Sequence, residues 1–298
     1  MIDLIFLGTG QAVPTARRNH TSILLRYGAE NILVDCGEGT QRQFRQAKLN
    51  PCSLTKILIT HWHGDHILGI PGLLQTLALN GYNKELEIFG PPGTKKYLDM
   101  ILGMFIFEGK IKLKVYELEK EGAFYEGAFF LEAYRVRHGT PCLAYVFREK
   151  DKRRMETAKL KKLKIEGKNI GILQKGMELK INNVTIKPED VSYIQKGKKI
   201  AFILDTRFFE ELVDIAKNSD ILISESTYNK ELEEKASEYN HMTSSDAATI
   251  AKKSNSKRLI LTHLSQRYEH DDTTILKEAK KIFKDTEIAE DLKKIKLQ

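Results

Sequence analysis

Short runs of apolar residues, broken by turn-forming residues, follow one another through the first half of the chain. Runs of this length and spacing predict β-strands. We expect them at residues 3–7, 22–27, 31–35, 56–60, 86–89, 112–118, 129–136 and 143–148. Helices are predicted for residues 39–48 and 67–80, the second of them directly behind the strand at 56–60.

A similar order of elements follows in the second half. Strands are predicted at residues 179–187, 200–205, 221–224 and 258–262, and helices at 208–218, 244–254 and 273–283. Thr243 or Ser244 is suited to cap the helix at 244–254. Two successive runs of mixed strands and helices predict an α/β fold. Two sheets pack together with helices outside them, in a four-layer αβ/βα sandwich.

Residues 149–177 interrupt this pattern because they are rich in lysine and poor in aromatic residues. We interpret them as an inserted arm between two parts of one core, residues 1–148 and 178–298. Residues 148–180 contain twelve Lys/Arg and five Asp/Glu, a surplus close to the +8 of the whole chain. Such concentrated charge favours a polyanionic partner. A solvated, charged helix is the alternative.

Composition narrows the class of protein further. Of the 298 residues, 41% are hydrophobic and 30% charged, which is typical of a globular protein. No apolar run approaches the roughly 20 residues of a membrane helix, and we expect no signal peptide. The cysteines Cys36, Cys52 and Cys142 are too few for a disulfide framework. These features predict a cytoplasmic protein that does not enter a membrane.

The strongest chemical signal is the sequence HWHGDH at residues 61–66, on the connection between a predicted strand and a predicted helix. Imidazole nitrogens and carboxylate oxygens are ligands that zinc takes. Three histidines and an aspartate on one tight turn are too crowded for a single tetrahedral ion. They predict ligands divided between two neighbouring ions.

Three further residues of ligand type follow apolar strands in the same way. His138 follows the strand at 129–136, Asp205 ends the strand at 200–205, and His263 follows the strand at 258–262. Sites of α/β sheets are usually built at such strand ends. Each residue alone could be an ordinary loop residue. Their common context predicts that they join residues 61–66 in one site.

With these residues in view, the sequence resembles the metallo-β-lactamase superfamily, and within it the short form of the ribonuclease Z family, which processes the 3′ end of transfer RNA. The resemblance spans nearly the whole chain. It rests on FLGTGQAVPTARRN (6–19), DCGEGTQRQ (35–43), HWHGDH (61–66), FILDTR (202–207), NHMTS (240–244) and LTHLSQRY (261–268).

The resemblance implies a metallo-β-lactamase fold with two zinc ions per subunit. One ion is expected at His61, His63 and His138, the other at Asp65, His66 and His263, and Asp205 is expected to bridge them. A hydroxide activated by the metals would attack the phosphodiester, leaving a 3′-hydroxyl on the transfer RNA and a 5′-phosphate on the trailer.

The resemblance also assigns roles around the metals. Asp65 would accept the proton of the attacking water, and His241 would act as general acid. Glu225 is a candidate to orient His241, although it could equally be a surface glutamate. Asp35 is expected to hold a metal ligand or its loop. A plain strand-end residue is the alternative for Asp35.

Contacts to RNA are expected outside the metal site. Arg17 and Arg18 lie where the family contacts the acceptor stem, and Ser265 and Arg267 where it grips the phosphate near the cut. The basic insertion matches in position the arm that grips precursor transfer RNA. The resemblance further implies a homodimer.

Two other functions remain open from the sequence. A hydrolase of the same fold could act on a small-molecule phosphodiester or thioester, but such an enzyme has no use for a basic arm. A catalytically inactive RNA-binding protein would lack metal ligands, whereas every expected ligand position is filled here.

Overall fold

Two seven-stranded mixed sheets form the body of the protein. The structure is a computed structural model that describes residues 1–104, 106, 111–181 and 184–297. The first sheet has the order β18 (Lys294–Leu297), β1 (Ile2–Gly8), β2 (Ser22–Tyr27), β3 (Glu30–Val34), β4 (Lys56–Leu58), β5 (Glu85–Gly90), β6 (Lys112–Glu117). The second has the order β17 (Thr286–Ile288), β16 (Leu259–Thr262), β15 (Ile221–Glu225), β14 (Lys199–Ile203), β9 (Pro141–Glu149), β8 (Phe129–Arg137), β7 (Gly122–Glu126).

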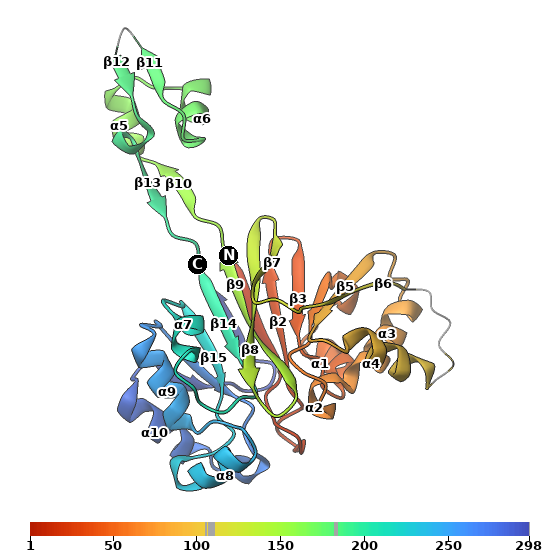
Figure 1. Cartoon of the computed structure of the whole chain (residues 1–298). Helices are drawn as coiled ribbons and strands as arrows, with labels where there is room; N and C mark the ends of the chain where they lie inside the picture. The colour runs from red at the N-terminus through yellow and green to blue at the C-terminus, as the bar shows by residue number, and fades with distance from the viewer. Residues whose placement is uncertain (105, 107–110, 182–183, 298) are drawn as a thin grey trace.

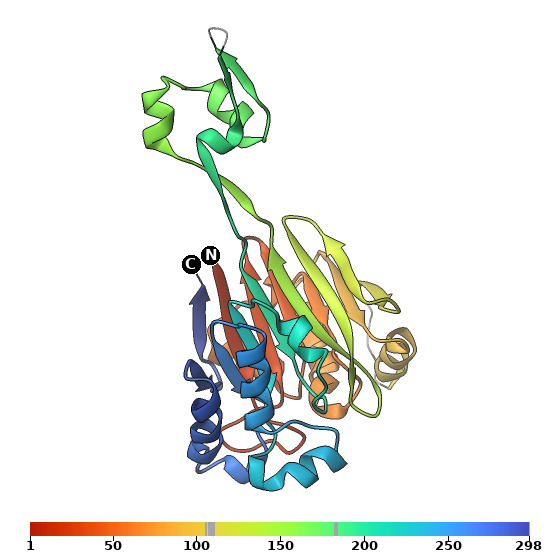
Figure 2. The ribbon, with the colours of Figure 1, turned by 60° about the vertical axis from the view of Figure 1, so that its left-hand side comes forward.

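The two sheets face each other across an apolar core (Figure 2). β1, β14, β15 and β16 are buried along almost their whole length, because each lies between the facing sheet and a layer of helices. Strands that are covered on both faces appear in the sequence as continuous apolar runs. The largest buried side chains between the sheets include Phe6, Phe129, Tyr145, Phe147 and Phe202.

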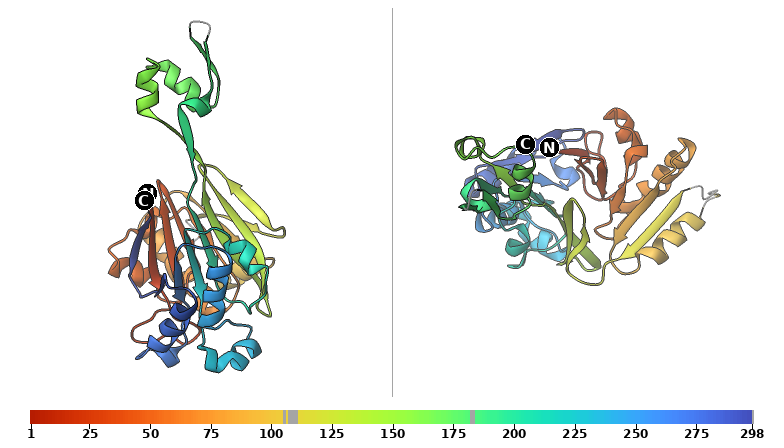
Figure 3. Two further views of the ribbon diagram at one scale, coloured as in Figure 1. Left: turned by 90° about the vertical axis from the view of Figure 1, so that its left-hand side faces the viewer. Right: turned by 90° about the horizontal axis from the view of Figure 1, so that it is seen from above.

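Helices cover the outer face of each sheet, as seen from above in Figure 3. On the first sheet these are α1 (Thr40–Gln46), α2 (Gly64–Ile67), α3 (Gly69–Leu79) and α4 (Thr94–Gly103). On the second they are α7 (Leu212–Ala216), α9 (Ser244–Lys253) and α10 (Thr273–Ile282), while α8 (Glu233–Glu238) lies beyond the end of the sheet (Figure 1). Thr243 caps α9, and its hydroxyl accepts a hydrogen bond from the Asp246 N–H. The predicted four-layer sandwich is confirmed.

A separate unit projects from one end of the second sheet (Figure 1). Its stalk is the antiparallel pair β10 (Lys152–Met155) and β13 (Ser192–Gln195). Its tip contains α5 (Thr157–Lys162), α6 (Lys168–Gln174), and the paired strands β11 (Leu179–Ile181) and β12 (Val184–Ile186). The tip has an apolar core of its own, formed by Leu160, Ile165, Leu173, Leu179, Ile186 and Val191. We call this unit, residues 150–198, the arm.

The arm is longer than the sequence predicted. The predicted boundary at residue 177 is wrong, because the chain returns to the body only after β13 has paired with β10. The strand predicted at 179–187 for the core belongs instead to the tip, where it is divided into β11 and β12. Residues 182 and 183 of that prediction lie outside the described residues.

Two predicted helices also differ from the structure. The helix predicted at 67–80 is divided at Leu68 into α2 and α3. Gly69 lies so close to the backbone of Gly37 that a side chain at this position would collide with the Gly37 carbonyl. The helix predicted at 208–218 is reduced to α7, because the residues before it form a loop at the site. Among the described residues, none of the helices has the length and apolar character needed to span a membrane.

Candidate metal centre and active site

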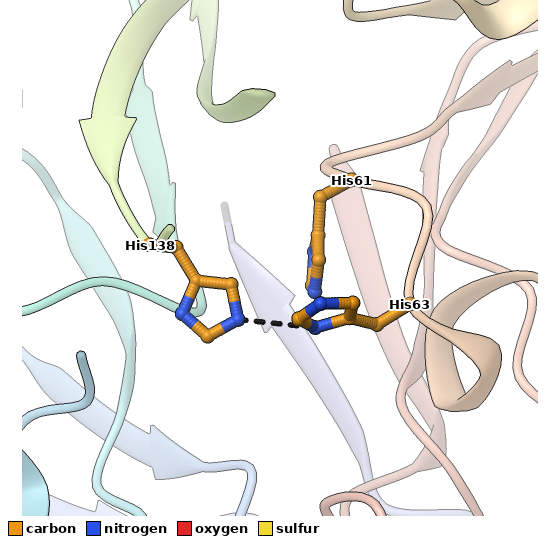
Figure 4. Close-up of side chains that lie close together, drawn as sticks. All are labelled: His61, His63 and His138. Atoms are coloured by element: carbon orange, nitrogen blue, oxygen red, sulfur yellow. Dashed lines mark hydrogen bonds between the residues drawn. The ribbon is translucent and has the colours of Figure 1, made fainter. Parts of the chain in front are cut away.

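The metal-ligand motif lies on the connection between β4 and α2. His61 and His63 are on the loop, His63 directly precedes α2, and Asp65 and His66 lie within α2. Figure 4 shows His61 and His63 pointing from this loop toward His138, which comes from the opposite sheet. His138 follows β8, so both sheets contribute ligands at the same end of the sandwich.

The first group of ligand atoms is formed by His61, His63 and His138, which lie together as a potential metal site. His63 Nδ1 is 3.2 Å from His138 Nε2. One oxygen of Asp205, Oδ2, faces this group at 3.8 Å from His61 Nε2 and 3.6 Å from His138 Nε2. Asp205 reaches this position because it follows the end of β14.

The second group is formed by Asp65, His66 and His263. His66 Nε2 is 3.3 Å from Asp65 Oδ2 and 3.3 Å from His263 Nε2. The other Asp205 oxygen, Oδ1, is 3.4 Å from His66 Nε2 and 3.2 Å from His263 Nε2. Ligands at about 2.0–2.2 Å from a tetrahedral zinc ion lie roughly 3.3–3.6 Å from one another. The second group therefore has the spacing of a zinc coordination shell, with Asp205 shared between the two groups.

Two buried atoms in this cluster lack a hydrogen-bond partner among the described residues, His61 Nε2 and Asp205 Oδ1. Leaving such atoms unpaired is costly in a protein interior. Both atoms belong to the ligand groups, so a bound cation would satisfy them. The donor set, which combines imidazole and carboxylate groups, fits divalent metal ions.

The protonation states of the cluster also suit a cation. Burial holds the pKa of His61 well below its usual value, so this imidazole is neutral and free to donate a lone pair. Burial opposes ionisation of Asp205, but His263 and His66 outweigh it and hold its pKa well below the usual range. Burial lowers the pKa of His66, but Asp205, Asp65 and Asp35 raise it well above its usual value. This arrangement of carboxylates favours positive charge at the centre.

Asp35 holds the second ligand group from behind. It follows β3 in a left-handed backbone conformation, with φ of 57°. Its Oδ2 accepts a 2.6 Å hydrogen bond from His66 Nδ1, which leaves His66 Nε2 for a metal. The Thr60 N–H and hydroxyl donate to the two Asp35 oxygens, each at 2.8 Å. Asp35 therefore fixes the ring of His66, one of the candidate ligands.

Two supporting contacts were not predicted from the sequence. The Thr227 hydroxyl lies 2.9 Å from His263 Nδ1 and 2.7 Å from Glu225 Oε2, and it links a candidate metal ligand to a buried carboxylate. His138 Nδ1 donates to the carbonyl of Asn240 at 3.1 Å. Thr227 lies two residues after Glu225, so its closeness in sequence to that candidate residue could have suggested a role. The Asn240 carbonyl, a backbone group, left no signal in the residue types.

His241 stands beside the two ligand groups, held by Glu225. Glu225 is fully buried at the end of β15, so the surface position considered from the sequence is excluded. Its Oε1 lies 3.0 Å from His241 Nδ1 and also accepts the Thr206 N–H at 2.7 Å. Burial lowers the pKa of His241, but the charge and hydrogen bond of Glu225 outweigh it and raise the pKa to about 9.

The predicted RNA contacts fall into two kinds of position. Arg17 and Arg267 are exposed, and Arg267 Nη1 donates to the buried Ser265 hydroxyl at 3.0 Å. Arg18 is only 7% exposed. Its guanidinium donates to Thr9 Oγ1, the Ala289 carbonyl and Asp272 Oδ2. These three hydrogen bonds turn the Arg18 guanidinium toward the protein, which argues against a substrate contact for Arg18.

The fold and the metal-ligand set together define the class, a metal-binding enzyme of the metallo-β-lactamase fold. Over 300 residues the chain is 39% identical to the ribonuclease Z of Methanothermobacter thermautotrophicus, covering 100% of this chain and 97% of that protein. The chain belongs to the ribonuclease Z family.

Solved structures agree with this assignment. The human tRNase Z, short form, superposes with a TM-score of 0.73 and 28% identity, covering 99% of both chains. A metallo-β-lactamase fold protein from Bacillus subtilis, YhfI, superposes with a TM-score of 0.72 over 99% of this chain and 98% of its own. At 19% identity it supports the fold alone. A family model described as anti-Pycsar protein Apyc1 matches residues 2–104, which include the HWHGDH motif.

Proposed function

We propose that this protein is a zinc-dependent endoribonuclease that removes the 3′ trailer from precursor transfer RNA. The observation that carries the proposal is the shared position of Asp205 between two ligand groups, with His241 beside them. Metal pairs of this kind act on phosphodiesters. Relatives named ribonuclease Z and tRNase Z give the substrate class.

Two zinc ions per subunit fit the residues present. His61, His63 and His138 would hold one, Asp65, His66 and His263 the other, and Asp205 both. When bound, such a pair lowers the pKa of water and stabilises charge on the attacking and leaving oxygens.

Residues of the protein accept the proton of the attacking water and supply a proton to the leaving oxygen. Burial opposes ionisation of Asp65, but His66 and His263 outweigh it and hold its pKa well below the usual range. The ionised Asp65 accepts the proton of the attacking water. His241 is protonated at neutral pH and donates to the leaving 3′-oxygen, while Glu225 keeps its ring in place. The products are a 3′-hydroxyl on the transfer RNA and a 5′-phosphate on the trailer, and no ribose 2′-hydroxyl takes part.

The position of the arm supports a homodimer. β9 begins near His138 and ends at the arm, and β14 begins at the arm and ends near Asp205. A nine-residue strand spans about 30 Å, so the arm and the metal centre lie at opposite ends of the sheet. In a homodimer, the arm of one subunit could bind the same RNA molecule that the metal centre of the partner subunit cleaves.

We propose that such a partner contacts an apolar stripe on α4 and its C-terminal cap residue Met104. Tyr97, Met100 and Met104 are 42%, 59% and 75% exposed and lie at helical spacing, so they form one apolar stripe. RNA would be held by the arm, by Arg17 and by Arg267 with Ser265.

We also propose a cytoplasmic location, where the unpaired Cys36, Cys52 and Cys142 would stay reduced.

The test is incubation with a 3′-extended precursor transfer RNA, with and without a chelator, followed by mapping of both product ends. The proposal expects one cut after the last retained nucleotide, with a 3′-hydroxyl on the transfer RNA, and no cut in chelator until zinc is restored. A protein that hydrolyses a chromogenic phosphodiester but leaves this RNA uncut is a small-molecule hydrolase instead.

A further inference from the structure

A hollow of about 320 Å³ opens beside His241, within the usual size range of ligand pockets. Its wall is formed by Arg137 at the end of β8, Arg207 and Phe208 before α7, Ser237 on α8, and His241 itself. The ligand groups that would hold the ions lie on neighbouring loops, and Figure 1 shows α8 at this end of the molecule. The reaction proposed above uses His241 but assigns nothing to this space.

We infer that this hollow binds the last nucleotide that the transfer RNA retains, with its base against Phe208 and its phosphate at Arg207. The inference rests on the proposed function. In that reaction the leaving 3′-oxygen must lie within hydrogen-bond reach of His241, which protonates it. The nucleoside that carries this oxygen is therefore next to His241, and the hollow is a space of nucleotide size that His241 lines.

Glu225 positions both His241, the proposed general acid, and the loop that forms part of the wall of the hollow. Glu225 Oε1 accepts hydrogen bonds from His241 Nδ1 at 3.0 Å and from the Thr206 N–H at 2.7 Å. The Thr206 hydroxyl donates to the Arg207 carbonyl at 2.9 Å, and the Arg207 N–H donates to the Arg137 carbonyl at 2.9 Å. The loop carrying Arg207 and Phe208 is thus held at a set position relative to the proton donor.

Arg207 has the properties of a phosphate ligand. Its side chain is exposed and, within the described part of the chain, forms no ion pair and no hydrogen bond. The neighbouring Arg137 is different, since its guanidinium stacks on Phe209 at 4.4 Å and lies 3.6 Å from Glu211. The two acidic side chains in the wall are already engaged: Asp246 accepts from the Thr243 N–H and hydroxyl, and Glu233 forms an ion pair with Lys230. Arg207 is therefore the guanidinium available to an incoming phosphate.

Phe208 has the properties of a stacking platform. It is half-buried and packs on the apolar cluster between the second sheet and its helices, while it also lines the hollow. A ring held on one side by the core can offer its other face to a base at little entropic cost. Stacking of this kind accepts any base, which suits a nucleotide whose identity differs among transfer RNAs.

The first experiment places 2-aminopurine at the last retained nucleotide of a 3′-extended precursor and measures fluorescence on binding to metal-free protein. Wild type is expected to quench the probe by stacking. Phe208→Leu keeps the apolar volume without the ring face and should remove most of the quench, while Phe208→Tyr should keep it. Phe283→Leu is the matched control, because Phe283 packs on the same cluster but does not line the hollow. Equal quenching by wild type and Phe208→Leu would overturn the inference.

The second experiment combines enzyme and substrate changes. Removing the base of the last retained nucleotide should lower kcat/KM of wild type about tenfold, the scale of one stacked base. The same substrate change should have little effect on Phe208→Leu, because the two changes remove one and the same stacking interaction. Arg207→Ala should raise KM more than it lowers kcat. If Phe208→Leu and removal of the base lowered kcat/KM independently, so that their effects multiplied, the stacking of this base on Phe208 would be contradicted. Wild type that leaves the intact precursor uncut would instead contradict the proposed function.

Discussion

Glu225 accepts a hydrogen bond from His241 Nδ1 at 3.0 Å across 16 positions of sequence, from a site with no exposure to solvent. A buried carboxylate is stabilised by a charged partner, and a histidine beside it is stabilised in its protonated form. The pair therefore favours a proton on His241 beside the candidate metal-ligand cluster, and the carboxylate that orients this histidine is buried away from solvent.

His241→Ala tests the role of this proton. We expect the variant to keep its metal and to lose about 10²- to 10⁴-fold in kcat, the usual scale for a general acid. Single-turnover cleavage and metal analysis of the same preparation measure both quantities. If the variant loses an ion, His241 is a metal ligand and the assignment is wrong.

The pH profile tests Glu225. The pKa of His241 is raised to about 9, so activity that needs its proton is present below this pH and is lost as the pH rises through it. Glu225→Gln removes the charge that outweighs burial, so the alkaline limb of kcat/KM should move to lower pH. Bound metal ions would move the alkaline limb of both proteins to lower pH, but the limb of wild type would still lie at the higher pH. Coincident limbs for wild type and Glu225→Gln would count against the pair.

Arg17 and Arg18 should behave in opposite ways although they are neighbours. Arg18→Ala breaks three internal hydrogen bonds and should lower the free energy of unfolding by about 2–4 kcal/mol. Arg17→Ala, at an exposed position, should leave stability unchanged and raise KM. Thermal melts and cleavage kinetics on both variants separate the two roles. A stable Arg18→Ala with raised KM would restore Arg18 as an RNA contact.

Charge on the arm should govern binding rather than chemistry. Replacing the exposed Lys161, Lys162 and Lys164 with alanine should raise KM far more than it lowers kcat. The salt dependence of binding should flatten by roughly one unit of slope for each phosphate that no longer meets a lysine. Lys280, Lys281 and Lys284 on and after α10 provide a control of equal charge. Equal effects of the two triple variants would indicate general electrostatic attraction only.

The sequence predicted the body of the fold because its strands are buried on both faces and appear as plain apolar runs. It misplaced the end of the arm, since the pairing of β10 with β13 joins segments separated by the whole tip. It also extended a helix over Phe208 and Phe209. Thr206 instead ties this stretch to Arg137 and Glu225, which keeps it as a loop.

The clustering of the candidate metal ligands was predictable because their residue types and strand-end positions are unusual together. Their supports were less so. A threonine such as Thr227 has many ordinary uses, and only the tertiary structure places it between His263 and Glu225. Arg18 shows the reverse error, because an arginine beside Arg17 has the sequence signature of a phosphate contact whether or not its guanidinium faces solvent.

The proposed mechanism depends above all on Asp205 holding two metal ions at once. The most direct test is metal content per subunit after zinc reconstitution, for wild type, Asp205→Ala, and Asp214→Ala as an exposed carboxylate control. We predict two ions in wild type and in Asp214→Ala, and almost none in a folded Asp205→Ala. Retention of two ions by Asp205→Ala would contradict this role of Asp205.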